Sequence, residues 1–134
     1  MTELVKKGVA VVSANYRMYS EAKYPEFIND SAAAIAWTMK NIKEYGEPLS
    51  FFIGGSSAGG YLSEMLCFDK KYLAQYGIDS DLINGYIHDA GQPIVHFNVL
   101  RARGIDSRRV IIDEAAPIFI FLIIVILHQC RFLC

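Results

Sequence analysis

The sequence has no excess of charge of either sign. Its 134 residues include 13 Lys and Arg against 14 Asp and Glu, which gives a formal net charge of −1. Four arginines gather in one stretch of the chain, at Arg101, Arg103, Arg108 and Arg109. Acidic residues are interleaved with them, as is typical of a solvated surface. Because nucleic-acid binding needs a basic patch, we expect no nucleic-acid partner.

Cysteine is scarce, and its spacing fits neither a disulfide framework nor a zinc site. Cys67, Cys130 and Cys134 are odd in number and show no paired spacing. The three histidines lack the spacing of metal ligands, and no acidic cluster is present for Mg²⁺ or Ca²⁺. We therefore expect no metal and no other cofactor. The unpaired cysteines favour a reducing compartment, so we predict a cytoplasmic location.

Long hydrophobic runs are also few. The N-terminus lacks the apolar region and small-residue cleavage site of a secretory signal. The longest apolar run, at residues 118–127, would form a helix of only about 15 Å, half the hydrocarbon core of a bilayer. Isoleucine, valine and phenylalanine dominate this run, which favours a buried strand over the alternative of a membrane anchor. We treat residues 118–134 as an atypical apolar C-terminal tail and expect no membrane association.

No internal repeat, low-complexity tract or linker interrupts the chain. Apolar residues make up 53% of it, which is enough for a sizeable core. A chain of this length fits one domain and is too short for two of ordinary size. We therefore expect a single domain over residues 1–134.

Predicted strands alternate with predicted helices. Continuous apolar runs, typical of strands buried in a parallel sheet, occur at residues 8–17, 51–54 and 83–91. Amphipathic spacing predicts helices at residues 25–45 and 58–68, with shorter helical segments at 69–78 and 96–105. Residues 108–117 form either a strand or a connector. This order predicts an α/β fold of three layers, α/β/α, in which helices cover both faces of a mostly parallel sheet.

A G-x-S-x-G motif lies where the second predicted strand meets its helix. It consists of Gly55, Ser56, Ser57, Ala58 and Gly59. A strand that reverses into a helix within so few residues strains its apex residue, here Ser57, and requires small neighbours two residues before and after it. The Ser57 hydroxyl would then lie at a helix N-terminus, where the main-chain N–H of Ala58 is free to bind an oxyanion.

Two other functions of this motif are possible. A glycine-rich turn that merely caps a helix has the same composition. A phosphate-binding loop is the second alternative, although the segment lacks both the G-x-G-x-x-G spacing and the Gly-Lys-Ser/Thr ending. The motif lies between a predicted strand and a predicted helix, and this context favours a nucleophilic serine.

At these residues the sequence resembles the esterase/lipase group of the α/β-hydrolase superfamily, which includes hormone-sensitive-lipase-like and kynurenine-formamidase-like enzymes. The resemblance extends from about Gly8 to Pro117, and FFIGGSSAGGYLSEML looks like the nucleophile elbow and its helix. VVSANYRMYSEAKYPEFIND looks like the preceding strand and loop, with Ser20 and Glu21 at a position where the family has Pro-Glu. The resemblance implies a partial α/β-hydrolase fold and a hydrolase of carboxylic esters or small amides that forms an acyl-enzyme on Ser57.

A serine nucleophile needs a histidine as base, and three histidines follow Ser57. His88 lies within a predicted strand, where a packed histidine is favoured. His96 precedes a short helix, which it could cap, or it could line a cleft. His128 alone occupies the late position that the resemblance implies for the base.

The triad acid has two candidates. Asp89 follows a predicted strand at its C-terminal end, where sites on parallel sheets form, and Asp113 also follows an apolar run. We take Asp89 as the candidate acid and His128 as the candidate base. The acid at the family's usual position is absent, because no Asp or Glu follows the apolar run of the tail.

Other parts of the resembled fold are missing. The Gly-rich loop that supplies a second oxyanion donor would precede Gly8, as would a strand that the family places between the first two predicted strands here. The alternative function is therefore a truncated, non-catalytic α/β-hydrolase fragment. Without that strand, either the first two predicted strands close up through the crossover helix at residues 25–45, or the sheet keeps an open edge. Through such an edge we expect self-association.

Overall fold

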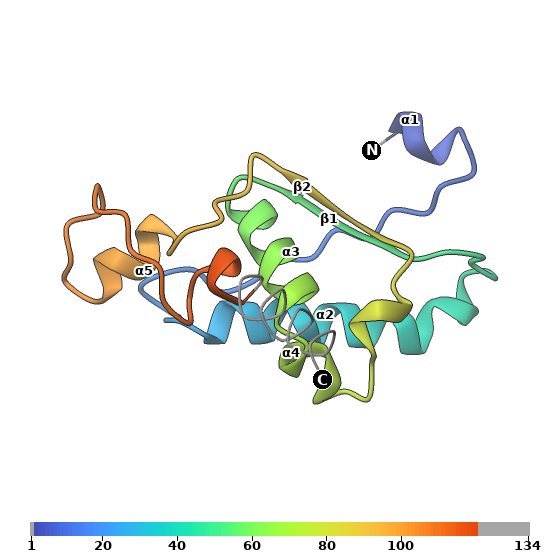
Figure 1. Cartoon of the computed structure of the whole chain (residues 1–134). Coiled ribbons are helices and arrows are strands. Elements are labelled where there is room, and N and C mark those ends of the chain that lie inside the picture. The colour runs from blue at the N-terminus through green and yellow to red at the C-terminus, as the bar shows by residue number, and fades with distance from the viewer. Residues whose placement is uncertain (1, 121–134) are drawn as a thin grey trace, which may run out of the picture.

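The computed structural model of the protein describes residues 2–120 and is built around a small parallel sheet (Figure 1). Helices lie beneath the paired strands in this view. Its elements in chain order are α1 (Thr2–Val5), α2 (Glu26–Asn41), the 3₁₀ turn η1 (Ile42–Glu44), β1 (Phe52–Ser56), α3 (Ala58–Phe68), α4 (Lys71–Ala74), the 3₁₀ turn η2 (Ser80–Leu82), β2 (Gly85–Asp89) and α5 (Phe97–Ala102).

The sheet consists of β1 and β2, which run parallel. Their register pairs Phe52 with Gly85 at one end and Ser56 with Asp89 at the other. Helix α3 connects the strands and packs against both of them. The C-terminal ends of β1 and β2 therefore meet at one edge of the sheet. The predicted α/β class, with a parallel sheet and a connecting helix, is confirmed.

Among the described residues, helices cover only one face of the sheet. Helices α2 to α5 lie on the same side, and α2 packs on α3 and α4 (Figure 1). On the other face, the side chains of Phe52 and Ile87 are 64% and 59% exposed. Residues 2–120 thus supply the sheet and one of the two helical layers expected from the sequence.

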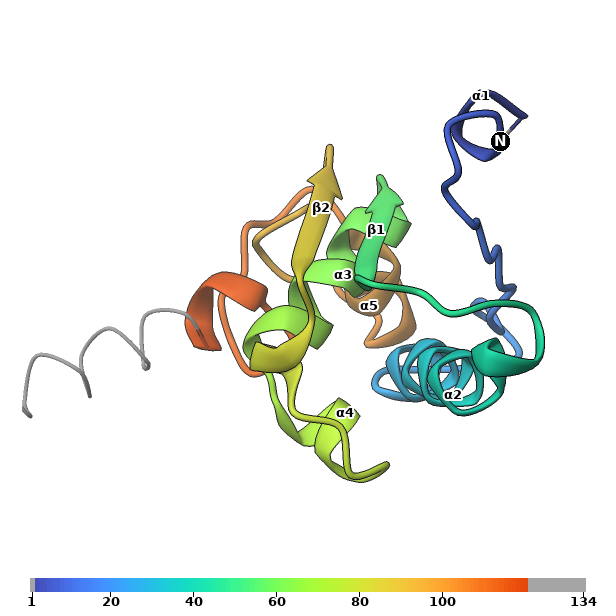
Figure 2. The same ribbon diagram turned by 90° about the vertical axis from the view of Figure 1, so that its right-hand side faces the viewer.

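The strand predicted at residues 8–17 is wrong. Residues 9–18 have no regular secondary structure, and almost all of them are exposed. They run alongside β1, on the side away from β2 (Figure 2). A strand forms only when a neighbour lies close enough to accept and donate main-chain hydrogen bonds, about 4.8 Å away. Here a cavity separates the segment from β1, so its apolar residues have no sheet to join.

The C-terminal part also differs from the prediction. Residues 117–120, where we expected the buried strand to begin, are helical. Residues 108–116 form an irregular connector with no strand. The rest of the tail, with His128, Cys130 and Cys134, lies outside the described residues. Within residues 2–120, no helix is long and apolar enough to cross a membrane.

The core has two neighbouring parts that Tyr61 connects. The larger part packs α3 against α2 and α4, with Ile28 and Met65 fully buried. The smaller part packs α5 against Ala115 and Ala116. The Tyr61 hydroxyl donates a hydrogen bond of 2.8 Å to the Ala115 carbonyl. Burial raises the pKa of Tyr61, so this hydroxyl keeps its proton and remains a donor.

Replacement of the buried Tyr61 by phenylalanine tests this connection. Tyr61→Phe leaves the Ala115 carbonyl without its donor, and we expect the free energy of unfolding to fall by about 1–3 kcal/mol. Chemical denaturation of the full chain measures the change. Tyr45→Phe is the control, because the Tyr45 side chain is 75% exposed and its loss of a hydroxyl is expected to have no effect. Equal stability of both variants would contradict the prediction.

Candidate active site

Ser57 lies at a sharp reversal between β1 and α3. Its backbone has φ 54° and ψ −115°, and it directly precedes the first residue of α3. Its N–H donates to the Asp89 carbonyl at 2.9 Å, and its carbonyl accepts from the Tyr61 N–H at 3.0 Å. Ser57 is exposed. The strained conformation and outward position expected of the apex residue are both present, and the hydroxyl stands at the positive end of α3.

The two motif glycines differ in their steric role. A Cβ at Gly55 would lie 2.3 Å from the Gly59 carbonyl carbon, so only glycine fits there. A Cβ at Gly59 would meet nothing within 4 Å. The expectation that both positions must be small is therefore correct for Gly55 and wrong for Gly59, because the main chain of Gly59, and not its side-chain direction, faces the strand.

Ala58 is the first residue of α3 and is half-buried. The N–H groups of the first helical turn have no acceptor within the helix. The N–H of Ser57 is already bonded to the Asp89 carbonyl. The main-chain N–H of Ala58 is therefore the first one after the reversal that can donate to an oxyanion beside Ser57.

The structure separates the two candidate acids. Asp89 is exposed at the end of β2, in register with Ser56 and thus beside the reversal. Asp113 instead pairs with Arg103 at 2.6 Å and accepts from the Ala115 N–H at 2.9 Å. Asp113 therefore stabilises the connector, and Asp89 is the carboxylate at the same sheet edge as Ser57.

Two of the three histidines have packing roles. His96 is 5% exposed and caps α5, where its Nδ1 accepts from the Asn98 N–H at 3.3 Å. His88 lies on β2, and its ring is near those of Tyr86 and Phe68, each with its centroid 6.2 Å away. Burial lowers the pKa of both histidines, so each favours the neutral form.

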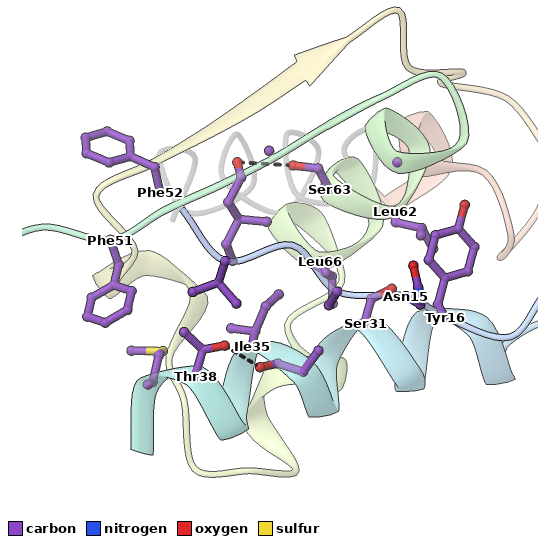
Figure 3. Close-up of a pocket in the computed structure, with 17 residues that line it drawn as sticks. Asn15, Tyr16, Ser31, Ile35, Thr38, Phe51, Phe52, Leu62, Ser63 and Leu66 are labelled. Carbon is purple, nitrogen blue, oxygen red and sulfur yellow. Dashed lines mark hydrogen bonds between the residues drawn. The ribbon is translucent and has the colours of Figure 1, made fainter. Parts of the chain in front are cut away.

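A cavity of about 230 Å³ extends from Gly59 along the free edge of β1 (Figure 3). It lies between residues 12–16, α2, β1 and α3, and every residue that lines it is uncharged. Ile35, Leu62 and Leu66 form part of its apolar wall. This cavity separates the extended N-terminal segment from the sheet. Residues 2–120 contain no group of three or more His, Cys, Asp or Glu side chains that could hold a metal ion.

A sharp, exposed serine turn between a parallel strand and its helix is the arrangement found in α/β-hydrolases. A family model described as BD-FAE matches residues 1–96. The chain belongs to the BD-FAE family. This family is of the α/β-hydrolase type, so the resemblance seen in the sequence is confirmed.

Curated relatives of this BD-FAE chain carry esterase names. Esterase LipQ of Mycobacterium tuberculosis is 30% identical over 125 residues, which cover 80% of this chain and 30% of LipQ. Probable carboxylic ester hydrolase LipM of the same species is 39% identical over 66 residues, 48% of this chain and 15% of LipM. Carboxylesterase NlhH, also from M. tuberculosis, is 42% identical over 57 residues, 42% of this chain and 18% of NlhH.

The chain spans less than a third of the length of each of these relatives. No solved structure matches it. Together the family match and the relatives support a hydrolase family of the carboxylesterase type.

Two residues near the reversal, Gly60 and Gly91, were not predicted from the sequence. A Cβ at Gly60 would lie 2.8 Å from both the Asp89 carbonyl oxygen and the Gly91 Cα. The sequence signals were a second glycine directly after the motif and a glycine as the last residue of the predicted strand at 83–91. Neither pattern shows that Gly60 and Gly91, 31 residues apart in the chain, touch.

The glycine pair Gly55 and Gly59 gives a matched test of the reversal. Gly55→Ala forces a methyl group into the Gly59 main chain, which cannot move aside as a flexible side chain would. We expect it to lower the free energy of unfolding by about 1–3 kcal/mol. Gly59→Ala projects into open space and is expected to leave stability unchanged or slightly higher, because alanine favours helix. Denaturation midpoints measure both; equal losses would contradict the assignment.

Proposed function

We propose that this chain carries the nucleophile of a serine hydrolase that cleaves carboxylic esters through an acyl-enzyme on Ser57. The observation that carries the proposal is the backbone of Ser57, at φ 54° with an exposed side chain at the N-terminus of α3. A capping serine or a glycine-rich turn does not need this strained conformation. Strain of this kind persists where the surrounding structure enforces it, and such positions cluster at active sites.

In the proposed reaction, the Ser57 Oγ attacks the ester carbonyl carbon and its proton passes to a base. The carbonyl oxygen becomes an oxyanion, which accepts a hydrogen bond from the Ala58 N–H. The intermediate then expels the alcohol, which takes the proton from the base, and leaves an acyl group on Ser57. Water hydrolyses this ester with the help of the same base.

The proposed acid and the proposed base rest on different kinds of evidence. Asp89 is the candidate acid because its carboxylate lies at the sheet edge that carries Ser57. His128 is the candidate base because it follows the acid along the chain, as the α/β-hydrolase order requires. His128 lies outside the described residues, so its support is its place in the sequence alone.

The ester substrate class comes from the relatives, which are named esterase, carboxylesterase and carboxylic ester hydrolase. Small amides are the second substrate class that the sequence resemblance implies. The uncharged cavity beside Gly59 supports an uncharged substrate. A non-catalytic fragment is the second candidate function, and it is favoured by the packing roles of His88 and His96.

A covalent probe separates the two candidate functions. We expect a fluorophosphonate to label the full chain at Ser57 and p-nitrophenyl acetate to be hydrolysed, with both lost in Ser57→Ala because the attacking oxygen is gone. Mass spectrometry and release of p-nitrophenol measure the two effects. Ser56→Ala is the matched control, since Ser56 is exposed beside it and lies outside the proposed chemistry. Labelling that persists in Ser57→Ala would refute the nucleophile.

We also propose that the chain self-associates through its sheet. The strand β1 pairs only with β2 among the described residues, so its other edge has free main-chain groups. The uncovered face adds Phe52 and Ile87 as exposed apolar side chains. Open edges and apolar faces of this kind promote association.

Light scattering after size-exclusion chromatography tests the association. We expect oligomers in the wild type and a larger monomer fraction in Ile87→Lys, because a charge on the open face disfavours its burial. Leu82→Lys is the control, since Leu82 is 77% exposed in η2, outside the sheet. A clean monomer of the wild-type chain at all concentrations would end this proposal.

The proposals for the cellular location and the domain organisation of the protein are based on its sequence alone. The cytoplasm remains our proposed compartment because the three cysteines show no paired spacing. A single domain over residues 1–134 remains a prediction from length and from the absence of a linker in the sequence.

A further inference from the structure

The turn that follows β2 has a non-glycine residue with positive φ, as does the reversal that follows β1. This turn consists of Asp89, Ala90 and Gly91, and we call it the β2 turn. Within residues 2–120, Ser57 and Ala90 are the non-glycine residues with positive φ, at 54° and 48°. Each directly follows one residue of the pair Ser56 and Asp89, which are in register. The two strained residues therefore lie side by side at the same sheet edge.

A hydrogen bond connects the two turns. The Ser57 N–H donates to the Asp89 carbonyl at 2.9 Å, which extends the pairing of β1 with β2 by one residue beyond Ser56. This bond orients the peptide plane in front of Ser57. Since the Ser57 Cα follows that plane, the direction of the Ser57 side chain depends on β2 as well as on α3.

Glycine contacts hold the β2 turn in place. A Cβ at Gly60 would lie 2.8 Å from the Asp89 oxygen and 2.9 Å from the Gly91 nitrogen, so the first turn of α3 packs on the β2 turn main chain to main chain. The next turn of the same helix also approaches the β2 turn, because a Cβ at Gly91 would lie 2.3 Å from the Glu64 Oε1. The Asp89 carbonyl is thus confined between α3 and Ser57.

We propose that the β2 turn positions Ser57. The turn acts through the main-chain carbonyl of Asp89, and this action depends on Gly60 and on the positive φ of Ala90. Its effect on reactivity rests on the proposed function of Ser57, whereas its effect on the Ser57 backbone does not. The role is independent of whether the Asp89 carboxylate serves as the triad acid. A positive-φ serine costs free energy, and the β2 turn supplies the contact that maintains it.

Amide hydrogen exchange of the full chain, followed by NMR, measures the protection of the Ser57 amide independently of any activity. We expect the Ser57 amide to exchange slowly in the wild type and at least about tenfold faster in Gly60→Ala, because the added methyl group displaces the Asp89 carbonyl from its donor. Gly59→Ala is the matched control. Its Cβ meets nothing within 4 Å, so the Ser57 amide is expected to remain protected.

A second pair of variants keeps the test valid if Gly60→Ala does not fold. Ala90 is exposed, so a change there acts through the backbone. Glycine adopts positive φ freely, and Ala90→Gly is expected to keep the Ser57 amide protected. A β-branched residue disfavours this region strongly, and Ala90→Val is expected to expose the amide. Equal protection in Ala90→Val and Ala90→Gly would overturn the proposal.

The fluorophosphonate reaction then tests the effect on reactivity. In folded Gly60→Ala, we expect the maximal labelling rate constant at Ser57 to fall by about tenfold with the probe's dissociation constant unchanged, as for a misplaced nucleophile. A fall that only matches the loss of folded protein would refute the positioning role. If the wild-type chain is not labelled at all, the proposed function fails, while the exchange data still decide whether the β2 turn holds the Ser57 backbone.

Discussion

The close approach of main chains at one edge of the sheet is the constraint on which the site depends. β1 reverses into α3 at Ser57, and the reversal is possible because Gly55 allows the Gly59 main chain to touch the strand. Gly60 allows the same helix to touch the turn after β2. Three segments thus meet without intervening side chains, and the Ser57 N–H finds its acceptor in the Asp89 carbonyl. The exposed hydroxyl at the start of α3 follows from this packing.

The same arrangement explains why helices cover only one face of the sheet in residues 2–120. Helix α3 covers one face of the sheet, and α2 and α4 pack on α3. Tyr61 joins this core to the segment around Ala115 through a buried hydrogen bond. Because α2 to α5 all lie on this side of the sheet, Phe52 and Ile87 remain exposed on the other. Most of the buried apolar side chains therefore lie on the α3 side of the sheet. They stabilise the position of α3, at whose N-terminus Ser57 lies.

Periodicity and turn residues predicted the elements whose partners are close in the chain. The helices α2 and α3 and the strands β1 and β2 lie where spacing and glycines indicated. The strand expected at residues 8–17 failed because an apolar run forms a strand only beside a free edge within bonding distance, and a cavity intervenes. The strand expected in the tail is wrong at residues 117–120 for a similar reason, since β-branched residues favour a strand only where they can pair with a sheet.

By itself, the sequence determined the motif, the order of strand and helix around it, and hence that Ser57 would take a strained position at a helix start. Those features depend on neighbours within a few residues, which local sterics control. Only the tertiary structure decided that His96 caps α5, that Asp113 pairs with Arg103, and that Asp89 bonds the serine through its main chain. The contacts of Asp113 and Asp89 join segments that the sequence separates, and no local pattern records which segments touch. The His96 cap is a local contact, but the sequence left it open against a place in a cleft, and only the burial of His96 decided between them.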